Sequence, residues 1–478
     1  MIYYFNPDTE LALKAGKSTY YIAPAPVRQM AEDLALLPLW LAGSDDVLLT
    51  EVEPPASYLE YLQTLFPHHR FPRILTPNQL EAVHRPEPIV PWGWNPTLMT
   101  KLKRWGFDVA AYEAAAPARY LLNDKTYLEK VDSQLMQMGL RSAAKRHFTI
   151  LGVAEAEALL SQQPELFPGG GFLLKEAFSS SGRGHRWCRP EGNLPATPSE
   201  QTTKLSAQPS TPSNQLSAPS EQTIAPCEHP TAPASPLTPL HRQWISRRTQ
   251  RGEAIDMEPI YNKVLDFAML FNRTADGKAQ FCGYSLFETT AEGAYRGNIL
   301  ASDAAIIHLL SRYIDPALLI EAQQSYLQLF SQLPIGLTGP FGVDMMIYHE
   351  STGNGNGYTF HPDVEINCRP TMGLVAHRLC NRYLSPALSN INYHFNKSSS
   401  LFINQQDIKN LQERTNPQIP LGRFVVEGSA SNAQLLARHV ADSQTHPLVM
   451  DNQGGILKGY LPLTPVTSTT RFRAYLLI

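Results

Sequence analysis

Cysteine, long apolar runs and excess charge of either sign are all scarce in this sequence. It contains 5 cysteines among 478 residues, and no two of them form a C-x-x-C pair. This pattern speaks against a disulfide framework or a zinc ribbon and predicts a reducing compartment. The most apolar early stretch, residues 34–42, holds a proline and is far too short to cross a bilayer of about 30 Å. Because the first residues also lack a basic segment and a long apolar segment, we expect no secretory signal, no membrane partner and a cytoplasmic location.

Positive and negative charges are nearly balanced. Lys and Arg total 40 and Asp and Glu total 43, which gives a formal charge of −3. Without a basic surplus or a platform of aromatic and basic residues, no nucleic-acid partner is expected. Hydrophobic residues make up 43% of the chain, which is enough for ordinary globular cores. The length suggests about three domains.

Short strand-like and helix-like segments alternate over residues 1–116. We expect strands at 2–5, 46–50, 73–75 and 88–91, and helices at 27–36 and 57–66. Asn95 and Pro96 suit the N-cap and the first position of a further helix. Such alternation predicts a parallel α/β layer, in which ligands collect beyond the carboxyl ends of the strands. The loops at 6–10 and 92–95 are therefore candidates for a substrate site, with turn formation and aromatic packing as an equal alternative.

A compositional break interrupts the unit that begins at residue 117. Residues 189–243 contain no aromatic residue and are dominated by Pro, Ser, Thr, Ala and Gln. Such a segment cannot bury enough apolar surface to offset its ordering entropy, so we expect a flexible insertion in a surface hairpin. The resulting division is one unit over 117–257 that carries the insertion, a second over 258–382, and a C-terminal extension over 383–478.

The most informative motif joins two apolar strands. Asp344 lies on the first strand, and Glu365, Asn367 and Arg369 follow at alternate positions on and after the second. Residues at i and i+2 of a strand point to the same face, so the last three share one surface, while Cys368 points away. Carboxylate and amide oxygens are ligands of Mg²⁺, and arginine contacts phosphate oxygens bidentately. One such residue alone is usually a solvated strand edge, but the set in its apolar context predicts a magnesium and phosphate site.

Two further elements carry lysines. Lys175 lies inside an apolar strand, where its charge is costly unless it meets a negative group. A Ser/Gly-rich loop over 179–184 follows, and small residues there let backbone N–H groups approach a phosphate. Lys125 follows an Asn-Asp pair at the start of a predicted helix. Taken singly, this loop is often a flexible turn, and this lysine is more simply an exposed residue after an N-cap.

Together, and in this order, the three elements resemble the ATP-grasp superfamily over about residues 119–378. The resemblance implies an α/β (α+β) fold class: an ATP-grasp fold of two α+β subdomains with an N-terminal α/β pre-ATP-grasp domain. It implies ATP and Mg²⁺ as cofactors, small-molecule or peptide carboxylates and amines as substrates, and assembly as a homodimer.

The resemblance also implies roles for individual residues. Lys125 and Lys175 would be the two nucleotide lysines. Asp344, Glu365 and Asn367 would hold two Mg²⁺ ions. Arg369 and Arg296 would be the catalytic arginines, with Arg296 at the substrate carboxylate or tetrahedral intermediate, or else a surface arginine.

The remaining implied contacts belong to the glycine loop and the hinge. The loop residues that would fold over the β- and γ-phosphates are Ser180, Ser181, Gly182, Arg183 and Gly184. Backbone groups of Glu258 and Ile260 would contact adenine, although residues 256–260 depart from the family's Glu-aromatic-aliphatic hinge pattern.

The function implied is an ATP- and Mg²⁺-dependent ligase that activates a carboxylate as an acyl phosphate for attack by an amine. This chemistry needs positioning and charge neutralisation, and it needs no covalent nucleophile on the protein. In keeping with this, no G-x-S-x-G motif is present. The alternatives are an ATP-dependent small-molecule kinase and a catalytically silent nucleotide-binding protein. The complete set of metal ligands speaks against the silent protein.

Overall fold

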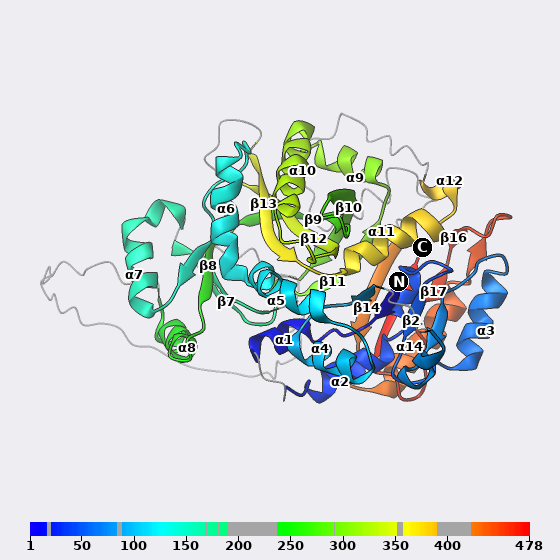
Figure 1. Ribbon diagram of the computed structural model, residues 1–478. Helices are drawn as coiled ribbons and strands as arrows, with labels where there is room; N and C mark the ends of the chain where they lie inside the picture. Colours follow the sequence, from blue (N-terminus) through cyan, green and yellow to red (C-terminus); the bar gives the residue numbers. More distant parts are fainter. Residues whose placement is uncertain are drawn as a thin grey trace, which may run out of the picture.

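The computed structural model describes residues 1–16, 21–83, 88–167, 170–179, 182–189, 237–290, 292–350, 357–389 and 422–478. These residues form three main sheets and a small two-stranded one. Figure 1 shows helices α7 and α8 with their sheet at one end, a long central sheet, and the N-terminal segment beside the C-terminal strands at the other end. None of the helices in the described ranges combines the length and hydropathy that a membrane span requires.

The N-terminal domain has the predicted parallel layer. Its sheet has the order β3-β2-β1-β4, with every neighbouring pair parallel. The strands are β1 (Ile2–Tyr4), β2 (Val47–Leu49), β3 (Arg73–Leu75) and β4 (Ile89–Pro91). The helices are α1 (Thr9–Lys14), α2 (Ala25–Asp33), α3 (Ala56–Leu65) and α4 (Pro96–Arg104), with a 3₁₀ turn at Leu37–Trp40. Asn95 caps α4 as predicted, because its side chain accepts a hydrogen bond from the Leu98 N–H.

The next unit, called here the lid, is an antiparallel sheet with the order β5-β8-β6-β7. Its strands are β5 (Phe148–Ile150), β6 (Phe172–Glu176), β7 (His185–Cys188) and β8 (Ile255–Pro259). Helices α7 (Val153–Gln162) and α8 (Pro239–Thr249) pack on it and bury Trp244 in a core with Phe172 and Met257. Helix α8 begins inside the insertion expected over 189–243, because Thr238 caps it and its apolar residues Trp244 and Ile245 are buried. Residues 190–236 of that insertion lie outside the described residues.

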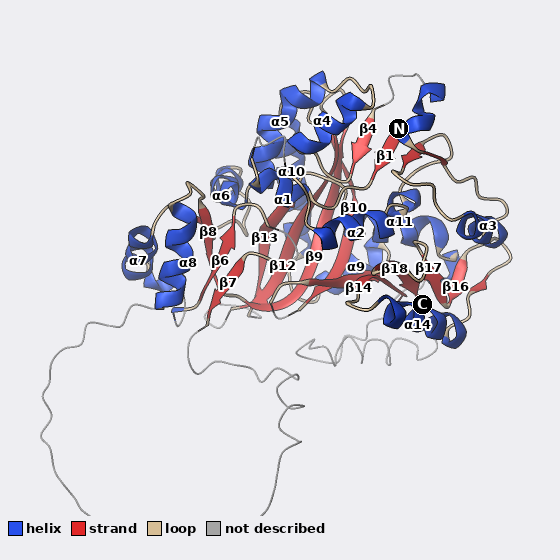
Figure 2. Cartoon of the chain, turned by 90° about the horizontal axis from the view of Figure 1, so that it is seen from below, coloured by secondary structure: helices blue, strands red, loops and turns tan. Residues whose placement is uncertain are grey.

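The central sheet has the order β13-β12-β9-β10-β11-β14-β18-β17, and Figure 2 shows its strands side by side. Its strands from the second predicted unit are β9 (Asn262–Arg273), β10 (Ala279–Thr289), β11 (Tyr295–Leu300), β12 (Gly339–His349) and β13 (Tyr358–Asn367). The helices that flank this part are α5 (Ala110–Asn123), α6 (Leu128–Gln137), α9 (Asp303–Leu310), α10 (Pro316–Ser331), α11 (Met372–Tyr383) and α12 (Pro386–Ser389). One core joins α5, α6, α9 and α10 to β9 and β12 through residues such as Leu135, Phe267 and Tyr326.

The C-terminal extension is not a separate unit, which corrects the expected division. Its described part supplies β14 (Gly422–Gly428), β17 (Tyr460–Pro462) and β18 (Phe472–Leu477) to the central sheet. The other elements are α14 (Asn432–Thr445), β15 (Val449–Met450) and β16 (Ile456–Lys458). β14 pairs with β11, and Phe424 and Leu476 share a core with Trp40 of the N-terminal domain. Such pairing between distant segments has no signal in the local sequence.

The expected boundary between residues 116 and 117 also falls inside an element, α5, which contains Pro117. The unit boundary moves because Ala115 and Leu122, on either side of it, are both buried in the core that joins α5 to β9 and β12. With that change, the structure has two α+β units behind an N-terminal α/β domain. The predicted α/β (α+β) class is confirmed.

The role of the C-terminal strands in the sheet can be tested with Phe424→Ala. Phe424 has 0% exposure, so truncation should lower the free energy of unfolding by about 3–5 kcal/mol. The matched control is Val440→Ala on α14, where the side chain is 45% exposed and the change should stay within about 0.5 kcal/mol. Urea denaturation of both variants makes the comparison. Equal losses would mean that β14 does not share the core of the sheet.

Candidate functional site

A large cleft lies between the lid, the central sheet and the N-terminal domain. Its volume is about 1660 Å³. Sites for single small ligands have about 300–1,000 Å³, so this one has room for a nucleotide and a second molecule. Predicted site residues that line it are Lys125, Lys175, Gly182, Arg183, Glu258, Ile260, Asp344, Glu365, Asn367 and Arg369.

The register between β12 and β13 brings the predicted metal ligands together. Asp344 pairs directly with Glu365, and Asn367 Nδ2 lies 3.3 Å from Asp344 Oδ2. The alternate residues Ile366 and Cys368 are buried in the core on the other side of the strand. The three oxygen-bearing side chains therefore share one face, as the strand alternation predicts.

The two carboxylates of this face have different electrostatic surroundings. Burial, and then the charge of Glu365, raise the pKa of Asp344 to about 7. Burial would also raise the pKa of Glu365, but Lys125 and Arg369 together lower it below its usual range. Asp344 thus carries a charge that the protein alone leaves poorly balanced. Two carboxylates and an amide oxygen in this state fit a divalent magnesium ion, which takes oxygen ligands.

Both predicted lysines are held by carboxylates at the cleft wall. Lys125 begins the 3₁₀ turn Lys125–Tyr127, and its Nζ lies 2.5 Å from Glu365 Oε1. Lys175 on β6 lies 2.8 Å from Glu258 Oε2, which supplies the negative partner that a lysine in an apolar strand requires. Burial would lower the pKa of Lys175, but Glu258 and Asp256 raise it, so the side chain stays charged. Two ammonium groups that line one cleft suit the phosphates of a nucleotide.

The described part of the glycine loop needs its glycines. Gly182 and Gly184 have φ angles of +71° and +85°, which residues with a side chain rarely adopt. A Cβ on Gly184 would lie 2.9 Å from Glu176 Oε2, and one on Gly182 would lie 2.9 Å from the Glu292 carbonyl oxygen. The loop therefore approaches the β10–β11 turn across the cleft. Ser180 and Ser181 lie outside the described residues.

The loop at 6–10 joins the site to the N-terminal domain. Glu10 Oε1 lies 2.7 Å from Arg369 Nε, and both side chains are largely buried. Asn6 in turn ties this loop to the other candidate loop, since its Nδ2 donates to the Gly93 carbonyl oxygen at 2.6 Å. Pro7, Glu10 and Trp92 line the cleft. The sequence marked both loops as candidates but did not indicate that Glu10 would hold Arg369.

At the hinge that ends β8, the side chain of Glu258 is directed to a lysine of the lid. Glu258 is 4% exposed, and its carboxylate faces Lys175. Its backbone is left for the base of a nucleotide, as the resemblance implies. Ile260, just beyond the strand, also lines the cleft.

Arg296 does not line the cleft. It lies exposed on β11, at an irregularity where Thr289 pairs with Tyr295 and Glu288 with Gly297. Arg296 is the extra residue of this bulge, and a bulge re-aims the side chains around it. Tyr295 and Asn298 line the cleft instead. Both residues lie within two positions of Arg296 in the sequence, but the bulge breaks the simple alternation that would select them.

Comparisons with known proteins give only distant matches. No family model and no curated protein matches the chain. It is similar to N5-carboxyaminoimidazole ribonucleotide synthetase from Thermus thermophilus, with a TM-score of 0.41, 12% identity and coverage of 100% of this chain and 93% of that one. A biotin carboxylase–βγ-ATP complex from Campylobacter jejuni matches with a TM-score of 0.41 and 10% identity, and the match covers 100% of this chain and 86% of that one. N5-carboxyaminoimidazole synthetase from Staphylococcus aureus with ADP matches with a TM-score of 0.38 and 12% identity, and the match covers 100% of this chain and 92% of that one. Likeness at this level leaves the geometry of the cleft as the basis for function.

The unbalanced charge of Asp344 predicts a pH-dependent cost in stability. Because its pKa rises from 3.8 to about 7 on folding, the native protein binds a proton that the unfolded chain releases between these values. The stability contributed by that proton is lost as pH rises. In Mg²⁺-free buffer, the Tm of Asp344→Asn minus the Tm of the wild type should therefore increase as pH rises toward 7. Asp45→Asn in an exposed turn is the control, and a Tm difference that does not vary with pH would contradict the prediction.

Proposed function

We propose that this protein is an ATP- and Mg²⁺-dependent ligase that activates a carboxylate as an acyl phosphate for attack by an amine. The observation that carries the proposal is the convergence of Lys125, Lys175, the metal-ligand face and Arg369 in one cleft, beneath a glycine loop. Each of these groups neutralises or orients a phosphate or carboxylate. None is a covalent nucleophile, which this chemistry does not require.

In this proposal, the nucleotide lies between the lid and the central sheet. Lys125 and Lys175 neutralise its phosphates, while the backbone of Glu258 and Ile260 contacts the base. Asp344, Glu365 and Asn367 hold Mg²⁺, which when bound neutralises charge on the transferred phosphoryl group. Lys125 lies between the phosphate site and the metal ligands, since it already pairs with Glu365.

The second substrate occupies the end of the cleft nearest the N-terminal domain. Arg369 is the cation at that end, and Glu10 holds its guanidinium in place. Its Nη1 also donates to the Pro370 carbonyl oxygen at 3.2 Å, and the remaining N–H groups would bind the reacting carboxylate and its phosphorylated form. The loop over 179–184 excludes water, which protects an acyl phosphate from hydrolysis.

The metal face is tested by Asp344→Ala and Glu365→Ala. Each change removes an oxygen ligand, so the rate of ADP formation should fall by about 10²–10³-fold while near-UV circular dichroism stays native. Asp276→Ala, in an exposed turn, is the control and should keep the wild-type rate. Wild-type rates in both variants would show that these carboxylates hold no catalytic metal.

The reaction type is tested by ADP release with Mg²⁺ and pooled substrates. A ligase requires both pooled carboxylates and pooled amines for sustained ADP formation, and dividing the pools then identifies the substrates. ADP formation with one pool alone, together with a stable phosphorylated product, would instead establish a kinase. Saturable nucleotide binding without ADP formation from any pool would favour a silent binding protein.

A further inference from the structure

A second cluster of titratable side chains lies behind Lys175, where the lid meets the central sheet. His147 precedes β5, Asp256 and Glu258 lie on β8, and His361 and Asp363 lie on β13. Four of these five side chains have 0% exposure, and Glu258 has 4%. Apart from the contact of Glu258 with Lys175, the proposed ligase reaction uses none of them.

The imidazole of His147 is oriented by the backbone. Its Nε2 lies 2.9 Å from the carbonyl oxygen of Asp363. A carbonyl oxygen only accepts hydrogen bonds, so Nε2 must carry a proton and donate. The other ring nitrogen, Nδ1, faces carboxylates, at 3.1 Å from Asp256 Oδ2 and 3.8 Å from Glu258 Oε2. Burial would lower the pKa of His147, but Asp256 and Glu258 raise it to about 9, so Nδ1 donates a proton to Asp256. A metal ion at Nδ1 would replace that proton, while Nε2 keeps its bond to the backbone, as the second nitrogen of a metal-binding histidine does.

His361 presents a nitrogen that nothing in the described part of the protein satisfies. Its Nδ1 lies 3.2 Å from Asp363 Oδ1, but its Nε2 has no hydrogen-bond partner among the described residues. Burial, and then the charge of Arg146, keep the pKa of His361 well below its usual value, so the ring is neutral. A neutral imidazole is the form that binds metal. An orphaned buried nitrogen is otherwise a costly feature for a core to retain.

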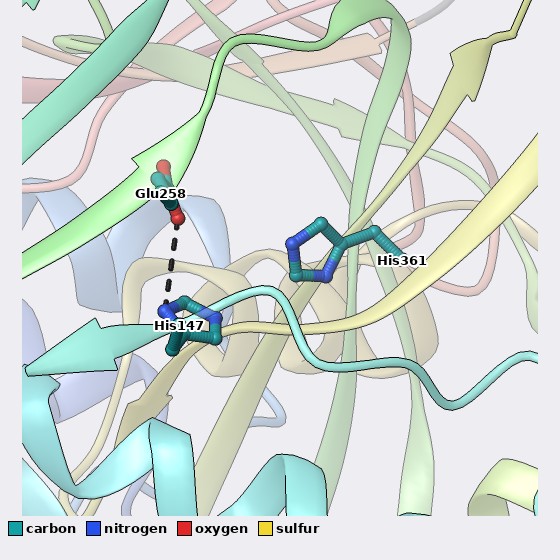
Figure 3. A group of neighbouring side chains, drawn as sticks. All are labelled: His147, Glu258 and His361. Atoms are coloured by element: carbon teal, nitrogen blue, oxygen red, sulfur yellow. Dashed lines mark ion pairs between the residues drawn. The ribbon is translucent and has the colours of Figure 1, made fainter. Parts of the chain in front are cut away.

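Three of these side chains converge on one point, as Figure 3 shows for His147, Glu258 and His361. One ligand atom from each lies within 4.8 Å of the other two. Ligand atoms around a tetrahedral zinc ion are about 3.4 Å apart, given bonds of about 2.1 Å. Small side-chain movements would therefore close the three atoms around an ion.

The charge of the region favours a cation as well. Four carboxylates, those of Asp132, Asp256, Glu258 and Asp363, are buried there. The buried cations that face them are Lys175 and Arg146. Burial raises the pKa of Asp132 to about 8, so these buried carboxylates are not fully compensated by the neighbouring cations. A divalent ion would neutralise carboxylate charge in a region that water does not reach.

We propose that this cluster is a second metal site, which binds one zinc ion through His147 Nδ1, Glu258 and His361 Nε2. Two imidazoles and a carboxylate are a ligand set for Zn²⁺, whereas the oxygen-only face at Asp344 suits Mg²⁺. The ion would join β5 and β8 of the lid to β13 of the central sheet. It would also contact the carboxylate that holds Lys175.

The test measures zinc content of the full chain without nucleotide. Protein is stripped with chelator, incubated with Zn²⁺, passed through gel filtration and analysed by mass spectrometry for metal. The wild type should retain about one zinc per chain. His308→Asn changes an exposed histidine on α9 and should retain it too, as should Glu365→Gln at the magnesium face.

His361→Asn should lose the bound zinc, and Glu258→Gln, which keeps the shape of the side chain, is a second variant in case the first does not fold. Circular dichroism checks the fold of both. Zinc should also raise the Tm of the wild type and leave that of the folded variants unchanged. The proposal is overturned if the wild type retains no more zinc than these variants, or if a folded variant retains as much as the wild type.

Discussion

The antiparallel register between β12 and β13 is the constraint on which the cleft depends. It places Asp344 opposite Glu365 and brings Asn367 to the same face. A shift of one residue would exchange this face with the buried one, putting Ile366 in the cleft and a carboxylate in the core. The apolar residues on the core side therefore stabilise the position of the polar ones.

Pairs of opposite charge then surround this face. Lys125 meets Glu365, Lys175 meets Glu258 within the lid, and Arg369 meets Glu10 of the N-terminal domain. Each pair brings together residues far apart in the chain, and each is at least partly shielded from water. Loss of one partner would leave the other charged group without compensation, which is costly in such surroundings. The same pairs hold the cationic groups at the positions where phosphate and carboxylate oxygens would bind.

Not all of the charge is balanced in this way. Asp344 keeps a raised pKa beside Glu365, and the cluster at His147 and His361 contains more carboxylates than cations. Both regions lie close to the nucleotide lysines, and both have donor atoms that suit a divalent ion. They differ in the type of donor, oxygen alone in one and nitrogen with oxygen in the other. This difference is the physical basis for assigning them to different metals.

Local pattern was enough to predict many elements and the shared strand face of Glu365 and Asn367. The alternation of Glu365, Asn367 and Arg369, the N-cap at Asn95 and the parallel N-terminal layer all follow from short-range periodicity and residue type. The exposed position of Arg296 outside the cleft could not be predicted in this way, because it depends on a bulge between β10 and β11. The pairing of β14 with β11 and the contact of Glu10 with Arg369 join segments separated by more than a hundred residues. Where no bulge interrupts a strand, as from Glu365 to Asn367, the sequence by itself determined which side chains share a face, since that depends on spacing alone. Only the tertiary structure decided which distant residues meet, because those contacts depend on how three separate sheets pack.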